Sequence, residues 1–151
     1  MEPVESNHCD RTDWPHGPWD DEPDRVEWRI GPFAALIVRN HSGALCGYVG
    51  VPAGHPAHGK HYSDDLLREL NCHGGLTFAD KCQAGGKICH VPQLGESDAV
   101  WWLGFDCNHC GDMAPGMSRF YRDDSGYYWR INNVKTEVEF LAKQLAVLVA
   151  P

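Results

Sequence analysis

An apolar run at residues 99–105 leads directly into a polar segment, and this junction constrains the fold more than any other part of the chain. The run contains two adjacent tryptophans and has the length of a buried strand. Segment 106–112 then holds two carboxylates, two thiols, an imidazole and an amide. A packed strand holds the loop at its end rigidly in place, and such loops commonly carry catalytic or binding residues. The junction therefore predicts a strand with a candidate site at its C-terminal end.

The rest of the pattern predicts an α+β fold. Alternating or continuous apolar residues indicate strands at 26–30, 33–38, 44–51, 76–79 and 99–105, with turn residues at 40–43 forming a hairpin. Glycines 47 and 50 suggest a bulge or a close backbone approach. A C-terminal helix is predicted by an apolar stripe at spacings of four and three, namely Val134, Val138, Leu141, Leu145 and Leu148. We expect an antiparallel sheet of about five strands packed by this amphipathic helix.

Two helix caps are also predicted. Ser63 is placed to cap a short helix over residues 64–70, and Asn132 or Asn133 is placed to cap the C-terminal helix.

The negative charge of the chain is concentrated at its N-terminus. Residues 1–24 contain eight acidic residues and one basic residue, Arg11, whereas the remainder holds 13 acids and 12 bases. No basic stripe of the kind that binds a nucleic-acid backbone is present in the sequence. Prolines exclude a regular helix in this segment. Residues 1–24 could form either a disordered tail or an arm that docks on the rest of the chain. Trp14 and Trp19 favour an extended arm whose indoles pack on a single domain formed by residues 25–151.

Composition also limits the number of domains and the expected cellular location. The 151 residues, 42% of them hydrophobic, can bury one core. No stretch approaches the roughly 20 apolar residues that span a bilayer, and no signal peptide is readable. The seven cysteines are an odd number, which favours free thiols or metal ligands over a complete disulfide framework. We therefore expect a cytoplasmic protein with no membrane partner.

Three kinds of site compete for the polar segments. The first is catalytic: His73, Asp106, His109 and Asp112 could act as acid and base or hold a cation for hydrolysis. Gly74 and Gly75 would let a substrate approach the backbone. Taken singly, each residue is equally explained as a turn cap or a hydrogen-bonding partner.

The second kind of site captures a small ligand without reaction. Aromatic walls and polar donors suit a sugar-like or nucleotide-like molecule. The residues proposed to bind it are Tyr48, His55, His58, Lys60, His61 and Trp102. Neighbouring residues on a strand face opposite sides, so at least one of the adjacent tryptophans is expected to be core. The histidine loop, residues 55–61, is equally compatible with a solvated surface loop.

The third kind of site is structural zinc. Cys107 and Cys110 have knuckle spacing, and a site without Cys110 could be built from Cys82, Cys89, His90 and Cys107. Zinc or another divalent cation is thus the expected cofactor if these residues converge. The alternative is that the cysteines are small buried hydrophobes.

Several segments together resemble a family of small uncharacterised proteins encoded by tailed bacteriophages and their bacterial hosts. The resemblance spans nearly the whole chain, at residues 14–19, 46–52, 54–56, 73–79, 101–109, 111–112 and the C-terminal helix. It implies an accessory protein in the host cytoplasm that acts on host defence or metabolism, and it carries no established activity. One departure is Cys110, where the family pattern has a small residue.

The sequence thus favours binding of a small polar ligand, with nucleotide-derived molecules as one class. A hydrolase using the His/Asp residues is the first alternative, and a zinc-binding interaction domain is the second. Association into a homo-oligomer is left open.

Overall fold

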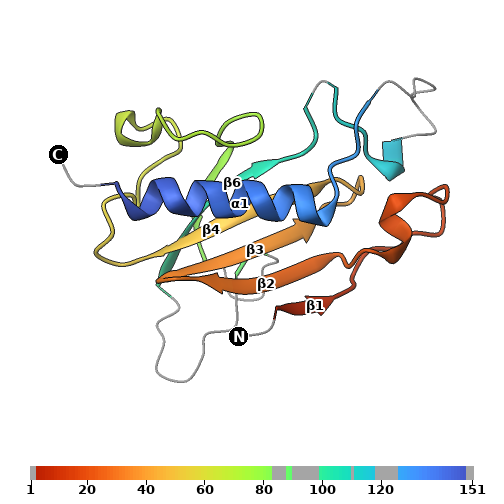
Figure 1. The fold of residues 1–151 in the computed structure, drawn as a ribbon, viewed down its shortest axis with the longest axis horizontal. Helices are drawn as coiled ribbons and strands as arrows, with labels where there is room; N and C mark the ends of the chain where they lie inside the picture. The colour runs from red at the N-terminus through yellow and green to blue at the C-terminus, as the bar shows by residue number, and fades with distance from the viewer. Residues whose placement is uncertain (1–2, 83–87, 90–98, 110, 118–125, 149–151) are drawn as a thin grey trace.

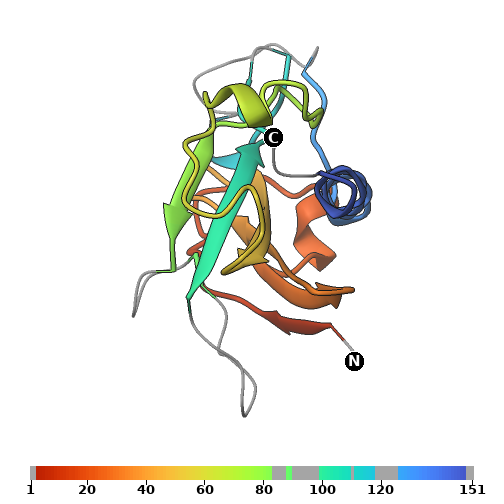
Figure 2. The ribbon, with the colours of Figure 1, turned by 90° about the vertical axis from the view of Figure 1, so that its left-hand side faces the viewer.

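Six strands form one antiparallel sheet in the computed structural model, which describes residues 3–82, 88–89, 99–109, 111–117 and 126–148. The strand order is β1-β2-β3-β4-β6-β5. Helix α1 (Ile131–Ala146) lies across one face of the sheet (Figures 1 and 2). The strands are β1 Val4–Ser6, β2 Arg25–Ile30, β3 Phe33–Arg39, β4 Leu45–Pro52, β5 Phe78–Lys81 and β6 Val100–Asp106. The α+β prediction is confirmed, with six strands in place of about five.

Alternate residues of β6 belong to two hydrophobic cores, one on each face of the sheet. Leu103 and Phe105 face the core beneath α1, together with the partly buried Trp101. Val100 and Trp102 face the opposite side of the sheet. The two adjacent tryptophans therefore point in opposite directions, as their spacing predicts.

Helix α1 buries most of the predicted stripe. Val134, Val138, Leu141 and Leu145 are fully buried against the sheet. Its close approach depends on Gly47, where an added Cβ would lie 2.7 Å from Val138 Cγ2 and 2.6 Å from the Phe105 ring. The close backbone approach predicted at this glycine is thus confirmed.

Both predicted helix caps are displaced. The expected helix at 64–70 is only a 3-10 turn, η2 (Asp65–Leu67), and Asp64 rather than Ser63 caps it by accepting a hydrogen bond from Leu66 N at 2.9 Å. At α1 the N-cap residue is Arg130; Asn133 lies three residues further on, and its Oδ1 accepts from Arg130 N at 3.0 Å. In each case the expected region is correct but the capping geometry selects a neighbouring residue.

The acidic N-terminal arm folds back onto its own chain. It supplies strand β1, which pairs with β2, and a 3-10 turn, η1 (Pro18–Asp21). Trp19 is buried and packs edge-on against Tyr128 with ring centroids 5.1 Å apart. The docked arm predicted from the tryptophans is therefore confirmed for Trp19, and β1 accounts for the additional strand.

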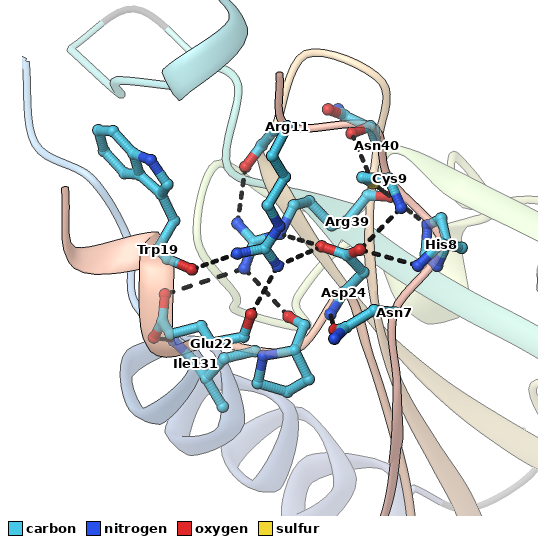
Figure 3. A network of polar contacts seen from close by, with 12 residues as sticks. Asn7, His8, Cys9, Arg11, Trp19, Glu22, Asp24, Arg39, Asn40 and Ile131 are labelled. Atoms are coloured by element: carbon cyan, nitrogen blue, oxygen red, sulfur yellow. Dashed lines mark hydrogen bonds and ion pairs between the residues drawn. The ribbon is translucent and has the colours of Figure 1, made fainter. Parts of the chain in front are cut away.

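A buried polar network anchors this arm (Figure 3). Asp24 Oδ1 accepts from Arg39 Nε at 2.9 Å and from Arg11 at 2.6 Å, while Asp24 Oδ2 accepts from the backbone N–H groups of His8 and Cys9 at 2.8 and 2.7 Å. Glu22 extends the network to the helix, because its Oε2 accepts from Ile131 N at 2.8 Å. A carboxylate at this position also interacts favourably with the positive end of the helix dipole.

A further 3-10 turn, η3 (Pro115–Met117), follows the loop after β6. Among the described residues, no helix has both the length and the apolarity needed to cross a membrane.

Candidate functional site

The four predicted catalytic residues converge just beyond the end of β6. Asp112 Oδ2 and Oδ1 lie 2.8 and 3.0 Å from His73 Nε2, and Asp112 Oδ2 also accepts from His109 N at 3.0 Å. An ionised carboxylate can only accept hydrogen bonds, so this contact fixes the proton of His73 on Nε2. The other ring nitrogen, Nδ1, has no hydrogen-bond partner among the described residues and is an acceptor when the ring is neutral.

A second His–Asp contact lies beside the first. His109 Nε2 is 3.3 Å from Asp106 Oδ1, and the rings of His73 and His109 lie 5.6 Å apart. His109 Nε2 is buried and is not aligned for a hydrogen bond with any described residue. Asp106 is instead held by Asn108 N, which donates to its Oδ1 at 3.0 Å. The four residues therefore form two adjacent His–Asp pairs.

Local backbone geometry explains why these pairs meet. Gly74 has a positive φ of 71°, and a Cβ at this position would overlap the His109 imidazole. The space that was expected to admit a substrate at Gly74 is therefore filled by the His109 ring. His73 also contacts Trp129, with ring centroids 4.0 Å apart and planes tilted by 37°.

A pocket of about 220 Å³ adjoins Asp106. Tyr48 and Asp106 project from β4 and β6 toward the face of the sheet opposite α1, as the pairing of Tyr48 with Gly104 and of Cys46 with Asp106 requires. The lining residues are Asn40, Cys46, Tyr48, Thr77, Phe78, Phe105, Asp106 and Asn108. Asp106 thus belongs both to the pocket and to the His–Asp pairs.

Most of these lining residues were not among the predicted site residues. The Asn40 side chain stabilises a turn, since its Oδ1 accepts from Ser42 N and Ala44 N. Thr77 and Phe78 read only as part of a strand. Their place in the pocket follows from the pairing of β5 with β6, in which Phe78 lies opposite Gly104. Because this register joins distant segments, no local sequence signal could have found them.

The predicted ligand-binding histidines lie elsewhere. The loop that carries them is anchored at the start of β6, where Trp101 Nε1 donates to Lys60 O at 2.9 Å and His58 Nε2 lies 3.3 Å from Ala99 O. The His–Asp pairs follow the other end of the same strand. The loop and Asp106 therefore do not form one site.

Two members of this loop have structural roles. His55 Nδ1 accepts from Ala57 N at 3.0 Å, so its Nε2 donates to Leu145 O at 2.8 Å, near the C-terminal end of α1. His61 Nδ1 contacts Ser63 Oγ at 2.8 Å, and its ring stacks on Tyr62. Of the other predicted ligand residues, Tyr48 lines the pocket, whereas Trp102 is fully buried in the core.

The predicted zinc ligands are not gathered in the described residues. Cys82 and Cys89 form a disulfide, with their Cα atoms 4.8 Å apart, and paired sulfurs offer no thiolate to a metal. Cys107 lies in the core beneath α1, whereas Cys82 packs on the opposite face. Burial, with the nearby Asp112, raises the pKa of the Cys107 thiol. His90 lies outside the described residues, among which no group of three or more metal-binding side chains is found.

Comparison of the chain with protein-family models, with curated proteins and with solved structures finds no match. The pocket and the His–Asp pairs are therefore the features of this chain that point to a function.

Proposed function

We propose that this chain binds a small polar ligand in the pocket between β4, β5 and the end of β6. The observation that carries the proposal is the pocket of about 220 Å³, which combines the Asp106 carboxylate with the aromatic side chains of Tyr48 and Phe78. Small-molecule sites pair apolar walls with a few polar groups that fix orientation. Here the rings would supply contact area, and Asp106 would accept hydrogen bonds from the ligand.

The size and polarity of the pocket limit the ligand. Sites for drug-sized molecules measure about 300–1,000 Å³, so a pocket of about 220 Å³ favours a smaller molecule or one part of a larger one. For a nucleotide-derived ligand, the base would enter the pocket and any phosphate would stay outside, since the described lining contains no basic residue. The resemblance to phage-encoded proteins supports an accessory role in the host cytoplasm.

The His73–Asp112 contact favours a second function, acid–base hydrolysis. A carboxylate that orients an imidazole and stabilises its protonated form is a recurring arrangement in enzymes. Asp112 is nearly buried, with 5% of its side chain exposed, and holds His73 at 2.8 Å. His73 Nδ1 would then receive a proton from water or substrate.

One experiment separates binding from turnover. The purified protein is incubated with a panel of nucleosides, nucleotides and amino sugars, dialysed, denatured, and the released molecules are identified by mass spectrometry. An intact retained molecule supports binding, and an altered molecule supports hydrolysis.

Three variants identify the residues responsible. Asp106→Asn should abolish retention, whereas His73→Gln should abolish turnover and leave retention unchanged. Asp65→Asn is the matched control, because Asp65 is an exposed carboxylate on η2. Retention of every panel member by Asp106→Asn at the wild-type level would refute the proposed site.

A further inference from the structure

The pocket beside β6 carries a single formal charge in its described lining. Asp106 is the one carboxylate there, and no Lys, Arg or His joins it. Burial and the charge of Asp106 raise the pKa of Cys46 to about 12, and burial also raises the pKa of Tyr48. The thiol and the phenol therefore stay neutral at pH 7, and Asp106 alone determines the charge of the lining.

One oxygen of Asp106 has unused acceptor capacity. Oδ1 accepts from Asn108 N at 3.0 Å and lies 3.3 Å from His109 Nε2. Among the described residues, Oδ2 has only a long contact of 3.4 Å, with Thr77 Oγ1. Because each carboxylate oxygen accommodates about two donors, Oδ2 can accept further hydrogen bonds. Thr77 belongs to the pocket lining, which places this oxygen at the pocket wall.

The aromatic wall adds a second attraction for positive charge. Tyr48 and Phe78 meet edge to face, with centroids 5.3 Å apart and planes at 83°. The faces of aromatic rings carry negative partial charge and attract ammonium and guanidinium groups. Phe78 is half-buried, so its ring forms part of the pocket without being sealed in the core.

We infer that the ligand of this pocket is an organic cation, whose ammonium or amidinium group binds Asp106 Oδ2 and lies against the rings of Tyr48 and Phe78. The inference rests on the proposed function and specifies the charge of its ligand. His109 is the ionisable residue that contacts Asp106 from outside the pocket. His109 Nε2 lies near Oδ1, at 3.3 Å, which leaves Oδ2 to the ligand.

Two probes of equal shape and different charge test the inference. Benzylamine is a cation at pH 7, and benzyl alcohol is its neutral counterpart. Each is titrated into the full chain at pH 7, and binding is measured by calorimetry and by NMR shifts of residues in the pocket. Benzylamine should bind about tenfold more tightly, the ratio that one charge-assisted hydrogen bond supplies.

The variants assign that preference to Asp106. Asp106→Asn keeps an acceptor for Asn108 N and removes the charge, so benzylamine should lose its tenfold advantage over benzyl alcohol. Asp65→Asn makes the same change in net charge at an exposed site and should keep the tenfold preference.

Other outcomes overturn the inference. Equal affinities, or tighter binding of benzyl alcohol, would exclude a cation site and leave small-ligand binding standing. Retention of only neutral or anionic molecules from the ligand panel would do the same. If neither probe nor any panel member binds, both the inference and the proposed function fail.

Discussion

Asp24 and Arg39 form an ion pair of 2.9 Å in which both side chains are completely buried. Asp24 ends the acidic arm, and Arg39 ends β3, so the pair fastens the arm to the sheet. Arg39 Nη1 also donates to Tyr128 Oη at 2.6 Å, and Tyr128 in turn donates to Glu22 at 2.7 Å. The arm is therefore held to the domain by charge as well as by the indole of Trp19.

Asp24→Ala should destabilise the fold strongly. Removing Asp24 leaves the buried Arg39 guanidinium with Glu22, at 3.9 Å, as its nearest carboxylate among the described residues, and loss of one partner of a buried ion pair costs about 3–5 kcal/mol. The free energy of unfolding, measured by urea denaturation, should fall by that amount. Asp21→Ala is the control, since Asp21 lies exposed in the same arm and should change stability by less than about 0.5 kcal/mol. Equal losses for the two variants would contradict a structural role for the pair.

Stability should decline with acid in a window set by Asp24. Burial opposes ionisation of Asp24, but the N–H groups of Cys9 and His8, together with Arg11, outweigh it and lower its pKa to about 2. A carboxyl whose pKa is lower in the folded state stabilises the fold above its unfolded pKa of about 3.9 and loses that contribution as the pH falls. Unfolding curves from pH 5 to pH 2 should therefore show about 2 kcal/mol lost through this group. An Asp24→Asn variant with the same pH dependence as the wild type would rule out this origin.

Gly74→Ala should disturb the His–Asp pairs, and Gly75→Ala should not. Both glycines have positive φ, at 71° and 80°, so each alanine costs about 1–2 kcal/mol through the backbone alone. Only the Gly74 Cβ meets the His109 ring, because nothing lies within 4 Å of a Cβ at Gly75. NMR shifts of the His109 ring should move in Gly74→Ala and stay in place in Gly75→Ala. Matching histidine spectra in the two variants would show that the ring does not lie over Gly74.

Cys82 and Cys89 should be recovered as a disulfide-linked peptide. The protein is alkylated under denaturing conditions without reductant, digested, and analysed by mass spectrometry. Cys46, Cys72 and Cys107 are free thiols in the structure and should all be alkylated. Elemental analysis of native protein from the same preparation tests the zinc prediction. One zinc per chain, with Cys82 and Cys89 both alkylated, would show that these cysteines bind a metal and not each other.

The local patterns of the sequence predicted the main elements well. The apolar run at 99–105 became β6, and the stripe from Val134 to Leu145 became the buried face of α1. The helix caps were misplaced by one to three residues, because a cap depends on backbone angles that several neighbouring polar residues can satisfy. The extra strand, β1, was missed because its three exposed residues carry no hydrophobic periodicity.

The candidate site divides in the same way. The sequence named His73, Asp106, His109 and Asp112, since their residue types gather around one strand end, and the fold brings all four together. The sequence did not predict that the histidine loop and Asp106 lie at opposite ends of β6, because composition alone does not tell which end of a strand a loop contacts. Nothing in the sequence indicated that Thr77 and Phe78 line a pocket.

The sequence by itself therefore determined the elements, the α+β class and the residue types available for chemistry, because periodicity and side-chain identity are local properties. Tertiary structure alone decided that Asp24 meets Arg39, that Phe78 faces Tyr48 and that Cys82 pairs with Cys89. These contacts depend on strand register and on the path of the arm. Both are settled by burial summed over the whole chain, which no single segment encodes.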